Sequence, residues 1–555
     1  MSTQGLVDKI TEEWESSGHN DAESEVFRHW DEDDPAEVPT DCAKCHSTTG
    51  FVDFIADGTV DNAAGIDTTI ECEVCHTNPE NGTLRVHTSV EFPSGIVIEN
   101  DGPDSLCMEC HQGRYSSPGV DEYISTRSTG EDTVSTKLSF RNIHYYAAAA
   151  NQFGTLVQGG YEYEDMYYDA RFSHVDGYNA CYTCHNPHSL EVRLDNCATC
   201  HTDPQNQTYW GGINDPRNIR YIGSYVDYDG DGNMDEGMYY EVEGVRNSLY
   251  ATIQAYAKDV AGKSIGYDYE NLTYPYFFID TNGNGFIDPA EADRTNAFNA
   301  WTPRLIKAAY NFQCSLKDPG GYAHGGKYLI QLMYDSAENL SEMLAHAPAT
   351  EDLNHSRSFL NRPRAPMAEA HSAAGLTRND EGHFNGGSDA WRHWDEDGEV
   401  STSCVKCHSA TGLAYYLETG LNQEGAHIAN GMLCTTCHTS PPALLAAGPV
   451  TFPSGALIDL GDSSNLCMNC HQGRESKVSL DNKINSSAGP YSFTNIHYYP
   501  VGAIMFGTEA QGGYEFAGKS YAGRRYWPNH NNMFGTCVQC HMGSDSSRQK
   551  ENGDL

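Results

Sequence analysis

One five-residue pattern, Cys-x-x-Cys-His, occurs nine times in this chain of 555 residues. The copies contain all but one of the 19 cysteines, and the remaining one, Cys314 in NFQCSLKD, is expected to be a buried thiol. In such a motif the two cysteines attach a haem through thioether bonds, and the adjacent histidine binds the haem iron. Zinc sites need no histidine at that fixed offset, so the repetition predicts nine covalently bound haem c groups.

We number the motifs 1 to 9 in chain order and term their histidines proximal. They occupy residues 42–46, 72–76, 107–111, 181–185, 197–201, 404–408, 434–438, 467–471 and 537–541. The cysteines expected to bind haem are Cys42, Cys45, Cys72, Cys75, Cys107, Cys110, Cys181, Cys184, Cys197, Cys200, Cys404, Cys407, Cys434, Cys437, Cys467, Cys470, Cys537 and Cys540. The proximal histidines expected to bind iron are His46, His76, His111, His185, His201, His408, His438, His471 and His541.

The composition fits a chain whose core is partly filled by haem. Only 39% of the residues are hydrophobic, and the 34 tyrosines can line porphyrin faces. We expect a multihaem cytochrome c fold that is mostly coil, with short α-helices around a stacked haem chain and few strands. The net charge of −43 disfavours binding to nucleic acid or anionic lipid, because their phosphates would be repelled.

Two long stretches of the sequence repeat each other. HWDEDDPAEVPTDCAKCHSTTG parallels HWDEDGEVSTSCVKCHSATG, and NIHYY recurs ahead of motifs 4 and 9. Motifs 1 to 4 therefore correspond to motifs 6 to 9, and motif 5 has no counterpart. We expect a first multihaem repeat with one extra haem at 1–201, a haem-free insert at 202–378 and a second tetrahaem repeat at 379–555.

Fifteen histidines lie outside the motifs, enough to give every iron a second, distal imidazole. Those that recur in both repeats are expected to be distal ligands: His19, His29, His144, His174, His383, His393, His497 and His530. For motif 5 the sequence favours His188, three residues after a proximal histidine, with His87 and His324 as weaker candidates. Two imidazoles leave iron low-spin, with no open position for a substrate. Spacing alone does not assign each histidine to an iron.

His19 has two interpretations. Its counterpart His383 follows the insert and can reach back to the first repeat. By the same symmetry, His19 would reach into the second repeat of a preceding subunit. A ligand donated across subunits builds a head-to-tail polymer that does not close. In the alternative interpretation, both histidines serve their own repeats.

The insert contains two patterns typical of calcium loops, and we expect a small mixed domain stabilised by Ca²⁺. DTNGNGFIDPAE, at 280–291, matches the EF-hand loop in full, with ligands expected from Asp280, Asn282, Asn284, Phe286 (through its carbonyl), Asp288 and Glu291. DYDGDGNMDEGM, at 227–238, offers Asp227, Asp229, Asp231, Asn233 and Asp235. Its last position is Met238, so a second calcium ion would need Glu236 or Glu241, and an ordinary Asp/Gly turn is the alternative.

The chain has no run of 18 apolar residues that would predict a transmembrane helix. Its first residues, MSTQGLVDKITEEWESSG, lack the basic start and apolar core of a signal peptide. Because the predicted haem chemistry requires export, we expect an extracellular or periplasmic protein whose numbering is that of a mature or trimmed chain.

The repeats resemble the extracellular multihaem cytochromes that polymerise into conductive filaments in metal-reducing bacteria and some archaea, particularly a tetrahaem type. The resemblance is carried by HWDED followed by CAKCHS or CVKCHS, by CMECHQGR and CMNCHQGR, and by NIHYY. It covers about 22–201 and 382–541, whereas the insert and motif 5 depart from it. It implies closely stacked haems with two histidine ligands each, one of them completed by an adjacent subunit, and two tetrahaem units fused in one chain.

Three functions are compatible with these patterns. The first is an electron carrier without enzymatic activity, the subunit of a head-to-tail homopolymer, that passes single electrons to redox proteins, minerals or other cells. The second is a reductase of nitrite, hydroxylamine or a sulfur oxyanion, with one open haem at Cys197, Cys200 and His201. The third is a calcium-stabilised structural or adhesive protein in which haems mainly fill space. A count of low-spin and high-spin haems separates the first from the second.

Overall fold

A computed structural model describes residues 3–99, 102–128, 130–175, 177–197, 201, 215–220, 226–234, 236–344, 375–380, 382–428, 430–440, 443–486, 489–524, 536–537 and 541. The chain forms two compact units. The first comprises Met1–Phe172, Gly177–Arg220 and Asp227–Arg378, and the second comprises Ser173–Asp176, Tyr221–Val226 and Asn379–Leu555. The first repeat and most of the insert therefore share one unit, and the second repeat belongs to the other.

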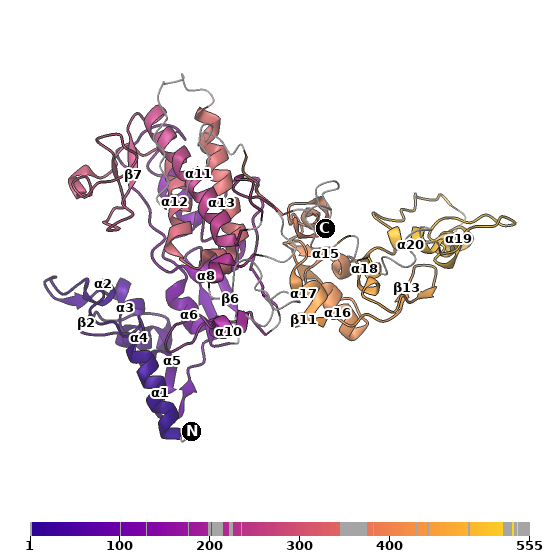
Figure 1. Ribbon diagram of the computed structural model, residues 1–555, viewed down its shortest axis with the longest axis horizontal. Coiled ribbons are helices and arrows are strands. Elements are labelled where there is room, and N and C mark those ends of the chain that lie inside the picture. Colours follow the sequence, from indigo (N-terminus) through magenta and orange to yellow (C-terminus); the bar gives the residue numbers. More distant parts are fainter. Residues whose placement is uncertain are drawn as a thin grey trace. The chain divides into compact units, whose positions relative to one another are not determined.

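The first repeat consists of short helices joined by loops and two-stranded hairpins (Figure 1). Its helices are α1 (Thr3–Glu15), α2 (Glu25–Arg28), α3 (Thr40–His46), α4 (Thr48–Asp57), α5 (Cys72–Cys75), α6 (Asp104–His111), α7 (Ser117–Ser125), α8 (Ala148–Phe153), α9 (Cys181–Cys184) and α10 (Leu194–Cys197). The antiparallel hairpins pair β1 (Glu37–Val38) with β2 (Ala64–Gly65), β3 (His76–Asn78) with β4 (Thr83–Leu84), and β5 (Ser89–Glu91) with β6 (Val97–Glu99). Single 3₁₀ turns are η1 (Pro79–Asn81) and η2 (Gly154–Leu156).

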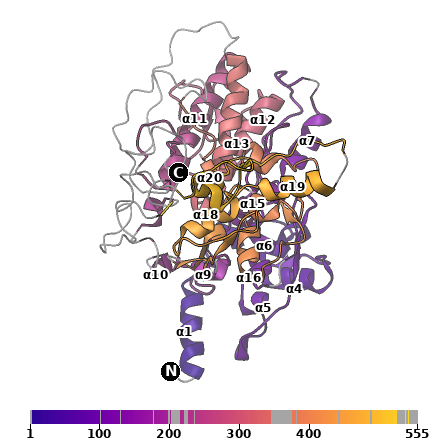
Figure 2. The same cartoon turned by 90° about the vertical axis from the view of Figure 1, so that its right-hand side faces the viewer.

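From α14 onward the described elements of the second repeat follow the order of the first repeat from α2, without a counterpart of η1. Figure 2 labels five of its helices, α15, α16, α18, α19 and α20. Its helices are α14 (Asp389–Arg392), α15 (Val405–His408), α16 (Gly412–Thr419), α17 (Cys434–Cys437), α18 (Ser464–Cys470), α19 (Lys477–Ser486) and α20 (Val501–Phe506). The antiparallel hairpins pair β9 (Glu399–Val400) with β10 (Ala426–His427), β11 (His438–Ser440) with β12 (Ala443–Leu444), and β13 (Val450–Thr451) with β14 (Leu457–Ile458). The 3₁₀ turns are η6 (Gly382–Phe384) and η7 (Gly507–Glu509).

The STTG and SATG sequences after motifs 1 and 6 explain why a capped helix packs closely on the motif helix in both repeats. The Ser47 side chain accepts a hydrogen bond from the Gly50 amide at 2.9 Å and so caps the start of α4. A side chain at Gly50 would lie 2.4 Å from the Ala43 carbonyl oxygen, so only glycine lets α4 approach α3. Ser409 and Gly412 make the same arrangement in the second repeat.

The buried side chains of both repeats form small, separate clusters. In the first unit one cluster contains Trp30, Val38, Ala43 and Ala64, and another contains Phe51, Val74 and Leu106. The second unit repeats the first of these with Trp394, Val400 and Val405. Such divided cores agree with a fold of short helices in which haem supplies part of the interior.

The insert has longer helices than the repeats. Helices α11 (Met238–Asp259), α12 (Pro303–Lys317) and α13 (Gly321–Leu344) pack against one another (Figures 1 and 2). The Thr302 hydroxyl accepts from the Leu305 amide and Pro303 occupies the first turn, which fixes the start of α12. The hairpin of β7 (Ile265–Tyr267) and β8 (Phe277–Ile279) and the 3₁₀ turns η4 (Pro216–Asn218) and η5 (Arg294–Asn296) complete it.

The insert packs directly on the QGGYEY segment of the first repeat. The Tyr310 hydroxyl donates to the Gly159 carbonyl at 2.7 Å, and the Tyr161 amide donates to Asn311 Oδ1 at 2.7 Å. Helix α13 kinks at Gly325, where a Cβ atom would lie 2.1 Å from the Asn151 carbonyl oxygen. The insert is therefore part of the first unit and brings residues of α12 and α13 close to the haem motifs.

None of the helices in the described part of the chain combines the length and the apolar character needed to cross a membrane.

Candidate haem and calcium sites

The motif cysteines lie on single helical turns. Motifs 1, 3 and 8 end or nearly end the helices α3, α6 and α18, whereas motifs 2, 4 and 7 form the four-residue helices α5, α9 and α17. One helical turn places the two sulfur atoms on the same side of the backbone, as attachment to two vinyl groups requires. The local structure therefore suits thioether attachment at these motifs.

Six proximal histidines face a histidine from outside the motifs. A metal–imidazole bond is about 2 Å long and the ring centroid lies roughly 1 Å behind the nitrogen, so two imidazoles on opposite sides of one iron have centroids about 6 Å apart. The observed pairs and centroid distances are His46–His144 at 5.9 Å, His76–His188 at 6.4 Å, His111–His19 at 6.5 Å, His185–His324 at 6.2 Å, His408–His497 at 5.8 Å and His471–His383 at 5.8 Å. Each pair has the spacing that an iron between the rings needs.

The pairing is the same in both repeats where both members are described. His46–His144 corresponds to His408–His497, and their ring planes are inclined by similar angles of 74° and 80°. His111–His19 corresponds to His471–His383, although the interplanar angle is 32° in the first pair and 79° in the second. Because the repeats diverged in sequence, the shared pairing indicates that it belongs to the fold rather than to one local packing accident.

Backbone carbonyls hold the proximal rings in a fixed orientation. In the first unit, His46 Nδ1 donates to the Val26 carbonyl at 2.9 Å, and His111 Nδ1 donates to the Tyr146 carbonyl at 3.0 Å. The equivalent bonds in the second unit join His408 to Ala390 at 2.8 Å and His471 to Tyr499 at 3.0 Å. A donating Nδ1 leaves Nε2 as the nitrogen available to a metal.

The distal histidines of the NIHYY segments have a constrained backbone. His144 and His497 both adopt φ = 83°, in the left-handed region that few side chains favour. The Asn142 side chain accepts from the His144 amide at 2.9 Å, and Asn495 makes the same bond to His497. Strained conformations that the surroundings hold in place are typical of functional sites.

Burial keeps several of these imidazoles neutral. Desolvation lowers the pKa of His19 to about 4, with His111 adding to the effect. Desolvation also lowers the pKa of His144 to about 4, helped by His46. Iron binds the neutral imidazole, so these side chains are in the ligating form at neutral pH.

The third motif of each repeat brings the attachment sites together. In the first unit the thiols of Cys45 and Cys110 interact with each other, and Cys107 interacts with Cys181. Asp104, Cys107 and Cys181 have ligand atoms within 4.8 Å of one another, but thioether formation would occupy both sulfurs. In the second unit Cys407 contacts Cys470, and Cys467 contacts Cys537. Haems attached at motifs 1, 3 and 4, and at 6, 8 and 9, would therefore be close neighbours.

A buried cation shows that the first unit fits a haem propionate. Lys317 is 3% exposed, and its Nζ atom has no hydrogen-bond partner in the described part of the chain. Nζ lies 3.3 Å from the ring centroid of Tyr145 and 4.2 Å from that of Tyr276. Desolvation lowers the pKa of Lys317 to about 7, which indicates that an anionic group is needed to hold its charge. A haem carboxylate near the His46–His144 pair would meet that need.

The structure changes several histidine assignments. His188, favoured for motif 5, faces His76 of motif 2 with nearly parallel rings, 8° apart. His324, a weaker candidate for motif 5, faces His185 of motif 4 instead. His19 and His383 lie in their own repeats, as the second interpretation proposed, because Ile70 and Met432 hydrogen-bond to their carbonyls beside motifs 2 and 7.

Other candidates lie away from the six pairs. His29 is exposed, its Nδ1 is 2.8 Å from Glu25 and its ring packs 5.1 Å from Trp30; His393 likewise packs on Trp394. His87 hydrogen-bonds to the buried Glu109 at 2.8 Å. His174 lies among the residues of the second unit, and desolvation lowers its pKa. Cys314 is buried, as expected. Cys200, Cys540, His530 and Asp235 lie outside the described residues.

The loop at 280–291 turns its polar side chains inward. Asp280 accepts from the backbone amides of Gly283 and Gly285 at 2.7 and 2.8 Å. Asp288 Oδ2 accepts from the side-chain nitrogen of Asn282 at 2.8 Å. Glu291 reaches back to the Thr281 amide at 2.8 Å. The loop follows β8 and precedes η5, so it is a calcium-type loop outside the helix–loop–helix setting of an EF-hand.

The loop at 227–238 gathers carboxylates around the start of α11. Asp227, Asp229 and Glu241 have oxygens within 4.8 Å of one another, as do Asp229, Asp231 and Glu236. Burial and the neighbouring Glu241 raise the pKa of Asp229 to about 8. Glu241 is fully buried and pairs with Arg220 at 2.6 Å. Both substitute ligands that the sequence offered are therefore within reach of this loop.

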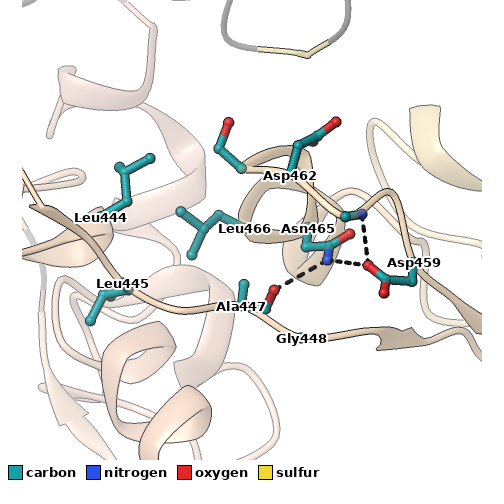
Figure 3. A pocket seen from close by; sticks show the side chains of 10 residues that line it. Leu444, Leu445, Ala447, Gly448, Asp459, Asp462, Asn465 and Leu466 are labelled. Carbon is teal, nitrogen blue, oxygen red and sulfur yellow. Dashed lines mark hydrogen bonds between the residues drawn. The ribbon is translucent and has the colours of Figure 1, made fainter.

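A cavity of about 340 Å³ lies beside motifs 7 and 8 in the second unit (Figure 3). Leu444, Leu445 and Leu466 line it, and the Asn465 side chain donates to Asp459 at 2.8 Å. The Leu445 amide donates to the carbonyl of the second cysteine of motif 7, and Leu466 directly precedes motif 8. The lining is mixed, with Asp459, Asp462 and Ser463 beside the leucines, so the cavity gives no evidence for or against a porphyrin there.

The chain is homologous to curated proteins described as C-type polyheme cytochromes. It is 26% identical to OmcB of Geobacter sulfurreducens over 411 residues, which cover 61% of this chain and 49% of the relative. It is also 26% identical to OmcC of the same species over 437 residues, 65% of this chain and 50% of the relative. The chain thus spans about half the length of these relatives. No family model and no solved structure matches.

Proposed function

We propose that this chain, a homologue of the polyhaem c-type cytochromes, carries single electrons along nine covalently bound haems, each held by two histidines. Haem supplies a one-electron iron couple when it is bound. The observation that carries the proposal is the set of six histidine pairs, each with one proximal ring and one ring from outside the motifs. Ligation from both sides closes the iron to substrates and favours electron transfer over catalysis.

The protein's own residues set the path. In each unit, the third motif contacts the first and the fourth through neighbouring cysteines. Cys75 of motif 2 and Cys437 of motif 7 are also close enough to Cys107 and Cys467 to interact electrostatically. Since electron exchange falls steeply with distance, this clustering supports a continuous chain with motifs 3 and 8 at its branch points.

Spectroscopy of the purified protein tests this function. Pyridine haemochrome analysis should give nine haems per chain, and near-infrared magnetic circular dichroism should show bis-histidine, low-spin iron. Imidazole planes at 74–80° and at 8° should give distinct electron paramagnetic resonance signals, the former with the larger g anisotropy. Predominantly high-spin iron would contradict the proposal.

A head-to-tail homopolymer is the assembly that the comparison of the two repeats supports. In the first unit, Asn151 and Tyr161 are buried under the insert. At the matching positions of the second unit, Ile504 is 73% exposed and Tyr514 is 39% exposed, and the nearby Phe516 is also exposed. An apolar surface of this kind marks an interaction site. We assign a second copy of the chain as its occupant; because the insert already packs on the first repeat of its own chain, that copy would contribute another surface.

Sedimentation velocity and electron microscopy test the assembly. Ile504→Asp combined with Phe516→Asp should reduce the polymer to monomers while leaving the haem content unchanged. Leu421→Asp, at a position 65% exposed elsewhere in the second unit, is the matched control and should leave the polymer intact. Monomers in the unaltered protein at all concentrations would contradict the proposed homopolymer.

The second candidate function is a reductase with one open haem. The second repeat favours motif 7, rather than motif 5, as the place of that open haem. His188, which faces His76, corresponds to Ser544 in the second repeat. The haem of motif 7 therefore lacks the distal ligand that motif 2 has within its own repeat. Cyanide or nitrite binding to one haem would support this function. Ser544→His should abolish that binding, as should a partner copy that donates a histidine to the same haem.

The proposed setting is extracellular or periplasmic, with redox proteins or minerals as donors and acceptors. Calcium is proposed at 280–291, and a second ion at 227–238, where both would stabilise the insert. Fractionation of the native cells and metal analysis of the purified protein test these assignments. A fraction confined to the cytoplasm, or protein without calcium after purification in its presence, would contradict them.

A further inference from the structure

The ring of His324, which faces motif 4, is held by a carboxylate. The His324 Nδ1 atom donates to the carboxylate of Asp318, with distances of 3.0 and 2.9 Å to its two oxygens. The described proximal rings with a fixed Nδ1 donate to neutral backbone carbonyls instead, as His185 on the other side of this site does to Leu190 at 3.3 Å. Motif 4 thus combines a carbonyl-held and a carboxylate-held imidazole.

Asp318 is built into the protein interior. It is 3% exposed and accepts from the Asn151 side chain at 2.8 Å and from the Gly320 amide at 3.1 Å. Both carboxylate oxygens therefore accept a hydrogen bond besides the one from His324, Oδ2 from Asn151 and Oδ1 from Gly320, and such bonds favour the charged form of a carboxyl group. A charged group in a dry site acts strongly on its neighbours, because little water screens it.

Gly320 and the kink of α13 hold His324 in place. A Cβ atom at Gly320 would lie 2.7 Å from His324 Cε1, so this position leaves room for the ring only as glycine. The kink at Gly325, directly after His324, is held against the Asn151 backbone. Asn151 therefore contacts both the kink and the carboxylate, which fixes the ring relative to His185.

We infer that Asp318 is a positioning residue that gives His324 partial imidazolate character and thereby lowers the reduction potential of the haem of motif 4 below those of the carbonyl-held haems. The inference rests on the proposed axial role of His324. A more electron-rich axial imidazole stabilises ferric over ferrous iron. The insert thus supplies both the proposed ligand and its electrostatic adjustment.

Redox titration of the complete, haem-loaded protein tests this inference with three variants. Asp318→Asn keeps the shape and should move one component at the low-potential end to a higher potential. Asn151→Ala removes a hydrogen bond that partly neutralises the carboxylate and should move the same component lower. Glu25→Gln is the matched control, because it alters the exposed carboxylate beside His29 and should move no component.

His324→Ala separates the inference from the function on which it rests. This variant should convert one haem to the high-spin form. If it does so while Asp318→Asn leaves every potential unchanged, or shifts one component lower, the role of Asp318 is wrong and the ligation stands. If His324→Ala leaves all haems low-spin, the axial assignment itself fails.

Discussion

His46 and His144 face each other with ring centroids 5.9 Å apart, although 98 positions separate them in the sequence (144 − 46). The proximal ring is fixed by the Val26 carbonyl, and the distal ring is carried by a left-handed backbone position that Asn142 holds. Three separate segments of the first repeat therefore meet at one iron site. The second repeat has the same arrangement around His408 and His497.

Removal of a distal histidine should open one haem. We expect His497→Ala to convert one low-spin haem to a high-spin or water-ligated form. The reason is that His497 is the imidazole that faces the proximal ring of His408. Optical and magnetic circular dichroism spectra of the oxidised protein measure the change. Tyr498→Ala, at the neighbouring residue that is 75% exposed, is the control and should leave the spin count unaltered.

An added methyl group at Gly320 should displace His324. A Cβ at 2.7 Å from the ring must push the imidazole away from His185, so Gly320→Ala should weaken the sixth ligand of motif 4. The expected result is a new high-spin signal of one haem and a lower unfolding temperature. Gly65→Ala, where nothing lies within 4 Å of the added carbon, should change neither. Identical spectra for both variants would contradict the placement of His324.

Calcium binding at 227–238 should strengthen as the pH rises from 6 to about 8. The apo protein holds a proton on Asp229, whose pKa is raised to about 8 by burial and by Glu241, and the cation must displace that proton. At 280–291, burial raises the pKa of Glu291, but hydrogen bonds from Thr281 outweigh it and lower it, so binding there should not vary over this range. Calorimetric titration at several pH values measures both sites. Asp229→Asn should remove the pH dependence of the first.

Loss of the buried Arg220 charge should destabilise the insert. Arg220 and Glu241 are both inaccessible to solvent, so Arg220→Met leaves an uncompensated carboxylate, at a cost of about 3–5 kcal/mol. Urea unfolding of the calcium-free protein measures the loss. Arg217→Met breaks the exposed pair with Asp215 and should have little effect on stability. Equal effects of the two substitutions would contradict the buried pairing.

Local sequence patterns predicted the structure well where it depends on residues close together in the chain. Short helices at the motifs, the helices of WTPRLIKAAYNF and YLIQLMYDSAENLSEML, and the inward-facing side chains of DTNGNGFIDPAE follow from residues within a few positions of one another. The homology with polyhaem c-type cytochromes agrees with the haem motifs. The number of haems, the calcium ions and the polymer remain predictions.

The spacing of histidines along the sequence did not predict which of them faces each proximal histidine. His188 and His324 were both considered for motif 5, yet the fold places them opposite His76 and His185. Repetition selected His19, His144, His383 and His497, each of which faces a proximal histidine. It selected His29 and His393 equally, and these rings pack beside tryptophans; their ligand roles remain predictions. His324 had no counterpart to signal it, because it lies in the insert.

By itself, the sequence determined which residues can form covalent bonds to haem, because that chemistry needs two cysteines and a histidine within a single helical turn. Tertiary structure alone decided which imidazoles face each other in the six described pairs, and that the Asp318 carboxylate holds the His324 ring. The physical reason is range: attachment is fixed by neighbouring bonds, whereas ligation from the opposite side depends on packing between segments that can be more than a hundred residues apart.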